Sequence, residues 1–262
     1  MINIIAENIS SATITALTEN PDLTFADALI DSTLAKVGRT VDIDDQWIKL
    51  AYAAAVDCDT VVLMQNNIQS TATVKIQANA TDSWGSPSVD QALTFTKDYR
   101  RSNELGRDIG VWSYQFSTTQ SYQYWRIFVD DSTNPDGYIE LSFVFMDENI
   151  VFPGMSVNQT FTRQTTSEPE FSESNQVYGI KRVQYNVANF VSPVVTESEK
   201  TTIDSFFNQV DLVTPYCMLV WENSLDVQRP LYVVNLKLPE WKRIETQSGL
   251  LWTFNMEIRE VF

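Results

Sequence analysis

The sequence contains no histidine, and this absence removes much of enzyme chemistry. A Ser-His-Asp triad, a Cys-His pair, a His-ligated zinc or haem site and a histidine pH switch are all excluded. A glycine-rich phosphate loop, a GxSxG motif and a cysteine pair at metal spacing are missing as well. We therefore expect a protein that is not an enzyme and has no cofactor, with no catalytic, cofactor-binding or metal-binding residues.

Cysteine and long apolar runs are also scarce. Cys58 and Cys217 are far apart and form neither a disulfide framework nor a metal knuckle, so we expect two reduced, buried thiols. The N-terminus lacks the basic and apolar segments of a signal peptide. No run approaches the ~18 apolar residues needed to cross a bilayer. We expect a soluble protein, without membrane insertion, that stays in the compartment where it is made.

Positive charge is low relative to negative charge. The chain has 18 Lys and Arg against 34 Asp and Glu, which gives a net charge of −16. This balance disfavours a nucleic-acid binder, because phosphates are bound by Lys and Arg. Hydrophobic residues make up 44% of the 262 positions, enough for a packed core. Together these features favour a structural or binding protein.

Acidic pairs are the only remaining material for catalysis. They are Asp44 and Asp45, Asp57 and Asp59, and Asp130 and Asp131. A glycosidase needs two carboxylates at a defined separation, one of them with a raised pKa. We expect these pairs to lie in solvated turns, and a hydrolase is the least favoured of the functions considered.

The sequence is rich in alternation of apolar and polar residues with a period of two, which is typical of half-buried antiparallel strands. Short apolar runs with β-branched or aromatic residues add further strands. The segments with one or the other signal are 61–64, 73–78, 124–129, 139–145, 216–221, 231–236 and 252–258. The pattern predicts a mainly β protein.

A turn is predicted at Asn134-Pro135-Asp136-Gly137. Proline presets φ at the second turn position, and glycine accepts a positive φ at the exit. The alternative is a calcium loop formed by Asp130, Asp131, Asn134 and Asp136. The EF-hand pattern fails, because Phe143 stands where the bidentate Glu is required. We favour a hairpin turn.

A helix is predicted over 197–210. Thr196-Glu197-Ser198-Glu199 forms a capping box. Apolar residues then recur on one helical face, which favours packing on the protein's own sheet over binding to a partner. A second, weaker helical or looped segment is expected near 22–30.

Two β domains are predicted, over 1–153 and 179–262. The stretch between them, 154–178, is mostly polar and contains proline, so we interpret it as an extended arm or linker. Exposed aromatic residues are a separate signal, because they stack on sugars or anchor interfaces. The candidates for contact with a partner or glycan are Trp84, Tyr99, Trp112 and Tyr114, with ordinary core packing as the alternative.

Four stretches resemble a discoidin-like, galactose-binding-type jelly roll found in tail proteins of long-tailed bacteriophages. They are 61–68, 72–79, 124–127 and 134–141. The arm contains a Ser-Asn-Gln-Val-Tyr segment at 174–178 that is similar to the arm of those proteins. The strands and the Thr-Glu-x-Glu helix of 181–262 resemble the tail-tube fold, a β-sandwich with one helix. The order of the two domains is reversed relative to distal tail proteins.

The resemblance implies a virion structural protein of the tail tip or baseplate, assembled in the host cytoplasm. Its copies would form a ring, a homohexamer, at the distal end of the tail tube. The partners would be other copies, the tail tube protein, and tip, hub or receptor-binding proteins. Six copies would bring about −96 charges, so DNA in transit would meet a like-charged passage. The alternative is a carbohydrate-binding module that recognises a host-surface glycan.

Within such a ring, the arm is expected to reach a neighbouring copy, with Phe161, Phe171 and Tyr178 as its inter-subunit contacts. The strands at 181–190 and 251–258 are the candidates for the channel wall. The jelly roll would face outward and bind another tail protein or a host glycan.

Overall fold

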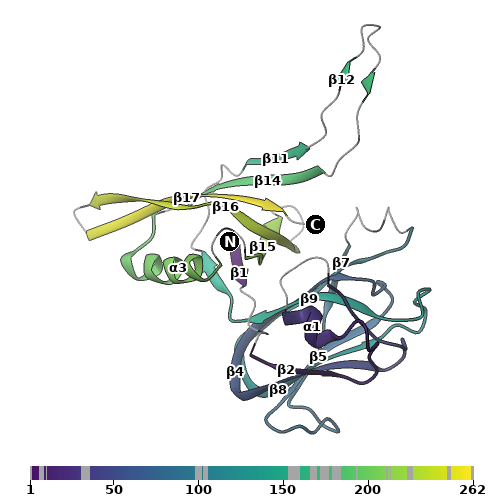
Figure 1. Cartoon of the computed structure of the whole chain (residues 1–262). Helices are drawn as coiled ribbons and strands as arrows, with labels where there is room; N and C mark the ends of the chain where they lie inside the picture. The colour runs from purple at the N-terminus through teal and green to yellow at the C-terminus, as the bar shows by residue number, and fades with distance from the viewer. Residues whose placement is uncertain are drawn as a thin grey trace. The chain divides into compact units, whose positions relative to one another are not determined.

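The structure, a computed structural model, describes the chain except for 1, 6–8, 10, 31–35, 98–101, 103–105, 153–159, 166–169, 172–176, 179–183, 193, 211, 213, 223–226, 247–248 and 261–262. The chain forms two compact units (Figure 1). Unit 1 comprises Met1–Ile2, Val151–Val220 and Leu231–Phe262, and unit 2 comprises Asn3–Ile150 and Trp221–Pro230. In the part of the chain that the structure describes, no helix is long and apolar enough to cross a membrane.

Unit 2 contains an eight-stranded sheet. Its main path runs β3-β9-β4-β8-β5-β6, while β2 pairs with β4 and β7 pairs with β8. The elements are β2 (Thr13–Ala16), α1 (Phe25–Ile30), β3 (Gly38–Arg39), β4 (Gln46–Asn66), β5 (Thr73–Asn79), β6 (Val89–Ala92), β7 (Thr94–Lys97), β8 (Gly110–Asp130) and β9 (Glu140–Asp147).

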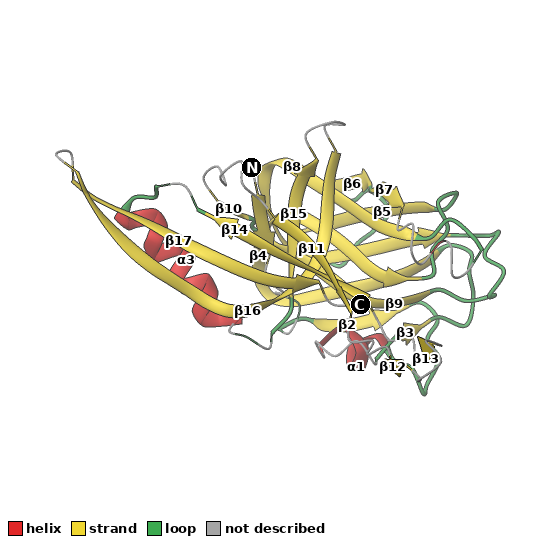
Figure 2. Ribbon diagram, turned by 90° about the horizontal axis from the view of Figure 1, so that it is seen from above, coloured by secondary structure: helices red, strands yellow, loops and turns green. Residues whose placement is uncertain are grey.

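Two long strands, β4 and β8, divide this sheet into two layers. Their pairing is irregular between Ala51 and Val56 and again between Cys58 and Thr60. On one side of the irregularities lie β2, β5 and β6 (layer A), and on the other side lie β3, β7 and β9 (layer B). The strong curvature of these strands is visible in Figure 2.

One hydrophobic core joins the two layers. Ile48, Ile76 and Ile127 from layer A belong to the same buried cluster as Leu63 and Val144 from layer B. Strand β9 of layer B is buried on both faces, since every residue from Leu141 to Met146 is buried. Layer A instead alternates buried and half-exposed residues, as the period of two predicts. The outer face of layer A is therefore partly exposed to solvent.

The segment predicted as weakly helical contains α1. Thr24 is its N-cap, because its hydroxyl accepts the Asp27 N–H at 3.2 Å and donates to the Asp27 carboxylate at 2.6 Å. Phe25 and Leu29 are buried in the core of unit 2.

A seven-stranded sheet, most of which belongs to unit 1, has the order β10-β1-β15-β16-β17-β14-β11. A separate ladder pairs β12 with β13. The strands are β1 (Ile2–Ile5), β10 (Ile150–Phe152), β11 (Thr160–Thr165), β12 (Glu170–Phe171), β13 (Val177–Tyr178), β14 (Gln184–Val191), β15 (Tyr216–Glu222), β16 (Val227–Thr246) and β17 (Gly249–Glu260). With both sheets in place, the mainly β fold class predicted from the sequence is confirmed.

Helix α3 (Glu197–Val210) packs on this sheet. Its capping box is confirmed, because the Thr196 hydroxyl accepts the Glu199 N–H at 3.3 Å and the Glu199 carboxylate accepts the Thr196 N–H at 2.7 Å. These bonds to Thr196 lower the pKa of Glu199. The predicted apolar face is buried, and Phe207 packs edge-on against Phe254 of β17 at 6.0 Å.

Both cysteines are free and buried, as predicted. Desolvation raises the pKa of each thiol well above its ordinary value, which makes both thiols unreactive.

Candidate binding surfaces

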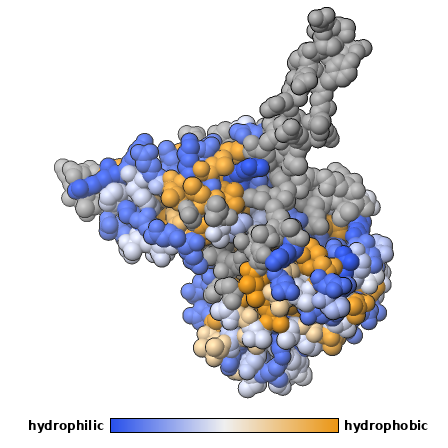
Figure 3. Space-filling model, viewed as in Figure 1, coloured by the Kyte–Doolittle hydropathy of each residue, from blue (hydrophilic) through white to orange (hydrophobic). Residues whose placement is uncertain are grey.

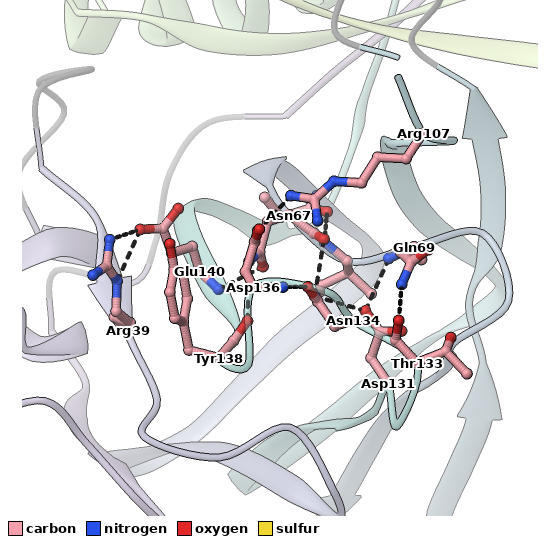
Figure 4. A network of polar contacts seen from close by, with 12 residues as sticks. Arg39, Asn67, Gln69, Arg107, Asp131, Thr133, Asn134, Asp136, Tyr138 and Glu140 are labelled. Carbon is pink, nitrogen blue, oxygen red and sulfur yellow. Dashed lines mark hydrogen bonds and ion pairs between the residues drawn. The ribbon is translucent and has the colours of Figure 1, made fainter. Parts of the chain in front are cut away.

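A turn forms at Asn134–Gly137 as predicted (Figure 4). The prediction of a hairpin was wrong, because the strands that it joins lie apart in the sheet: β9 pairs with β3 and β4, while β8 pairs with β4, β5 and β7. The Asn134 side-chain oxygen accepts the Asp136 N–H at 3.0 Å, and the Asn134 carbonyl accepts the Gly137 N–H at 3.2 Å. Gly137 has a φ of 74°, which is the conformation that favours glycine. Asp131 and Tyr138, which flank the turn in sequence, take part in the same polar network.

Asn67, which directly follows β4, forms hydrogen bonds to this turn through its side chain. Its amide nitrogen donates to the Asp136 carboxylate at 2.9 Å and to the Tyr138 carbonyl at 3.0 Å. Its oxygen accepts the Glu140 N–H at 2.7 Å. The sequence predicts no role for Asn67, because an asparagine after a strand carries no signal of a partner 69 positions away.

Replacing Asn67 with alanine is expected to lower the free energy of unfolding by about 2–3 kcal/mol. The change removes three hydrogen bonds from a side chain that is only 3% exposed and leaves buried groups without partners. Urea unfolding of Asn67→Ala measures the loss. The exposed Asn255→Ala in β17 is the control, and equal losses in the two variants would contradict the assignment.

The calcium alternative does not fit the geometry of the turn. Asp136 is paired with Arg107, and the side-chain oxygen of Asn134 is used by the backbone. The buried Asp131 carboxylate accepts the Gln69 N–H at 3.0 Å and the Asn134 amide at 2.9 Å, while desolvation raises its pKa. Among the described residues, no group of three or more His, Cys, Asp and Glu is placed to hold a metal ion. These side chains hold the turn in place.

Acid is expected to weaken this network through Asp136. The hydrogen bond from Arg107 lowers the pKa of Asp136 in the folded protein below its ordinary value near ~4. The unfolded chain therefore binds the proton more readily, so the stabilisation is present above about pH 4 and is lost as pH falls through the folded pKa. In Asp136→Asn, the free energy of unfolding should fall less between pH 6 and pH 3 than in the unchanged chain. Equal falls in urea titrations would refute this.

Arg39, Tyr138 and Glu140 complete the network. The Arg39 guanidinium lies 4.0 Å over the Tyr138 ring and donates to Glu140 at 2.9 Å (Figure 4). One face of the Tyr138 ring is thereby covered. We therefore assign the network a structural role, and the open surface of unit 2 lies elsewhere.

The outer face of layer A has a different character. It is defined by Trp47 and Lys49 of β4, Tyr124, Arg126 and Phe128 of β8, and Lys75 and Gln77 of β5. Trp47 lies opposite Phe128, and Lys49 lies opposite Arg126. Except for Gln77, these side chains are half-exposed. Aromatic rings and cations thus share one surface on central strands of the sheet.

Trp84, in the loop between β5 and β6, covers part of this face. Its indole lies 4.5 Å from the Arg126 guanidinium, and its N–H donates to Asp82 at 2.8 Å. Asp82 pairs with Lys49 at 2.7 Å, and the bonds from Lys49 and Trp84 lower the pKa of Asp82. The sequence analysis selected Trp84 as a candidate contact, and the structure places it beside the cations of this face.

The other predicted aromatic contacts lie elsewhere. Trp112 is 4% exposed and packs on Phe95 at 5.1 Å, so for this residue core packing replaces the predicted contact role. Tyr114 is half-exposed and packs edge-on against Phe116 at 4.9 Å. Tyr99 lies outside the described residues.

The predicted arm contains strands of unit 1. Phe161 lies in β11 opposite Ala188, Phe171 lies in β12 opposite Val177, and Tyr178 lies in β13 opposite Glu170. β11 and β14 form a hairpin that continues into β12 and β13, away from the seven-stranded sheet (Figure 1). The arm is therefore a β-hairpin of unit 1, where the sequence analysis allowed either an arm or a linker between domains.

The acidic pairs show no catalytic arrangement. Asp44 and Asp45 lie exposed in the bend before β4, as predicted for a solvated turn. The prediction was wrong for Asp57, which is exposed but lies within β4, and for Asp130, which is half-exposed at the end of β8. Asp59 instead is half-buried and accepts the Asn149 N–H at 2.9 Å, and Asp131 is buried in the turn network.

Comparison with known proteins gave similarities in structure only. No family model and no curated protein matches the sequence. The family 32 carbohydrate-binding module of C. perfringens NanJ, in complex with galactose, is 13% identical with a TM-score of 0.40, covering 56% of this chain and 98% of that one. A Paenibacillus sp. IK-5 chitosan-binding module is 16% identical (TM-score 0.40; 55% and 100% covered). A Streptococcus pneumoniae fucose-binding module is 10% identical (TM-score 0.40; 55% and 98% covered).

The TM-scores of these three solved structures lie below 0.5. Their low identities leave ligand assignment to the residues of this chain.

Proposed function

We propose that the chain is a structural protein, and not an enzyme, whose copies assemble into a ring at the distal end of a bacteriophage tail tube. The observation that carries this proposal is the hairpin formed by β11 and β14, which continues beyond its own sheet (Figure 1). Among the described strands, β12 and β13 pair only with each other, and an isolated two-stranded hairpin is marginally stable, so contact with a second copy would stabilise it. The location in a phage tail comes from the sequence resemblance.

The edges of the sheet in unit 1 support assembly. β10 and β11 are its outer strands, and an edge strand exposes N–H and C=O groups that can pair with another chain. A ring requires contacts between two different surfaces of the same chain. Two edges at opposite ends of one sheet provide such a pair of surfaces.

Apolar side chains on unit 1 offer further contact area. Val191 of β14 is 41% exposed, and Leu236 and Leu238 of β16 are 38% and 51% exposed. In the face of the molecule shown in Figure 3, apolar surface occurs in separate patches among hydrophilic residues. Such residues are suited to an interface between copies, where they leave water.

The charge of the chain suits a passage for DNA. A lumen lined by part of the −16 charges repels phosphates, so DNA in transit does not adhere. In this role the protein assembles in the host cytoplasm, resides in the virion tail, and joins the tube to tip, hub or receptor-binding proteins. A ring with a basic or neutral lumen would contradict this part of the proposal.

The test is the mass and shape of the purified full-length chain. We expect rings with a central hole in negative-stain images and a particle mass that is a multiple of 29.9 kDa in light scattering. A chain that stays monomeric at every concentration, including when mixed with phage tail tubes, would refute ring assembly.

The second candidate function is recognition of a glycan by unit 2. The outer face of layer A favours it, because Trp47, Phe128 and Tyr124 present aromatic side chains beside polar ones. Aromatic rings stack on the apolar faces of sugars, and polar neighbours fix their orientation. Binding of the full-length chain to a glycan array tests this function, and the absence of any bound glycan would refute it.

A further inference from the structure

We infer that the outer face of layer A binds a sugar residue that carries a carboxylate, within a glycan that is otherwise neutral. This inference rests on the second candidate function, and it names both the site and the ligand class. The carboxylate would contact Arg126, and the sugar rings would stack on the neighbouring aromatic side chains.

Arg126 is held in one orientation by its neighbours. Its Nε donates to the Gln77 side-chain oxygen at 2.7 Å, and the Trp84 indole lies 4.5 Å from its guanidinium carbon. Gln77 is itself 7% exposed and fixed by a second bond, at 3.0 Å, to Asp90. A guanidinium fixed in this way loses little conformational entropy when a ligand binds.

The binding edge of Arg126 is open. Among the described residues, neither Nη atom of Arg126 has a hydrogen-bond partner, and neither is a buried unsatisfied atom. Two parallel N–H groups match the two oxygens of a carboxylate. The side chain therefore presents a donor pair to solvent on a sheet face, without an ion-pair partner of its own.

The local charge is opposite to that of the whole chain. Lys49, Lys75 and Arg126 supply three positive charges around this point. Asp82 and Asp90 supply two negative ones, and both are already bound, to Lys49 and Lys75 respectively. One positive charge is left over in a chain of net charge −16. An isolated anionic group fits this site, whereas the total charge repels a polyanion such as nucleic acid.

The spacing of the face suits a sugar. Trp47 and Phe128 lie opposite each other, two register pairs from Lys49 and Arg126. Two residues along a strand correspond to about 7 Å. That distance is close to the span of one sugar ring. Tyr124 follows on the other side of Arg126, so aromatic rings flank the guanidinium along β8.

Oligosaccharides that contain one glucuronic acid or sialic acid residue test the inference, with their carboxyl-reduced counterparts as the neutral probes. Titration calorimetry of the full-length chain should show at least about tenfold tighter binding of the acidic probe. Arg126→Gln should remove that preference, and Arg126→Lys should restore part of it. Lys242→Gln, which removes an exposed charge from β16, should bind like the unchanged chain.

The outcomes separate this inference from the function on which it rests. Equal binding of acidic and reduced probes, or a preference that survives in Arg126→Gln, would refute the acidic ligand while glycan recognition stands. No binding of any probe would refute both. An unchanged circular dichroism spectrum and a cooperative thermal unfolding transition of Arg126→Gln show that the variant is folded and that a loss of binding comes from the site.

Discussion

Replacing Trp125 with alanine is expected to lower the free energy of unfolding by about 3–5 kcal/mol, the cost of removing a fully buried tryptophan. Trp125 has 0% exposure in the core of unit 2. Its ring packs edge-on against Phe116 and Tyr122, with centroids 6.3 and 6.0 Å away. Its N–H donates to the Tyr122 carbonyl at 3.0 Å, so alanine leaves both a cavity and an unpaired carbonyl.

Urea unfolding measures this effect, with Trp84→Ala as the matched control. Trp84 is half-exposed, and its loss removes one cation–π contact and one hydrogen bond, so about 1–2 kcal/mol is expected. Should Trp125→Ala not fold, Trp125→Phe keeps part of the volume and should lie between the two. A loss from Trp125→Ala as small as that from Trp84→Ala would show that the core is not organised around Trp125.

Shortening the hairpin of unit 1 is expected to convert rings into soluble monomers. Thr165 and Gln184 are directly paired, so Asn-Gly in place of residues 166–183 closes the hairpin with a two-residue turn. The variant keeps β11 and β14 and loses only residues 166–183, which include β12 and β13 and are called the extension below. Light scattering and negative-stain images measure the change, and the free energy of unfolding should remain that of the full chain.

A variant of unchanged length separates the two ways in which the extension could act. Phe171→Ser with Tyr178→Ser keeps the hairpin and removes its aromatic side chains. If those side chains make the contact between copies, this variant is monomeric as well, and if backbone pairing is sufficient, it still forms rings. Rings from the shortened variant would contradict any role for the extension.

Local signals in the sequence predicted the elements that depend on local physics. The capping box at Thr196 predicted a helix over 197–210, which is α3, and the Asn-Pro-Asp-Gly segment predicted the turn. The full lengths of β4 and β8 were missed. The exposed Ala53, Ala54 and Ala55 of β4 break the alternation, and the first half of β8 is too polar to be distinguished from a loop.

The candidate site was predicted only in part, for a related reason. Trp84 could be selected because an aromatic residue in a polar stretch is unusual. Its partner Arg126 could not, because their proximity depends on how β5 pairs with β8, and alternation alone does not determine register. Asn67 and Arg107 were missed for the same reason, since both act on a turn that is distant in sequence.

The two strands that run through both layers of unit 2 have a mechanical consequence. Because β4 and β8 are continuous from layer A to layer B, tension applied to one layer is carried by the same backbone into the other. Separating the two layers requires breaking backbone hydrogen bonds between β4 and β8. In the proposed ring at the end of a tail tube, this continuity would make the two halves of unit 2 resist separation under load.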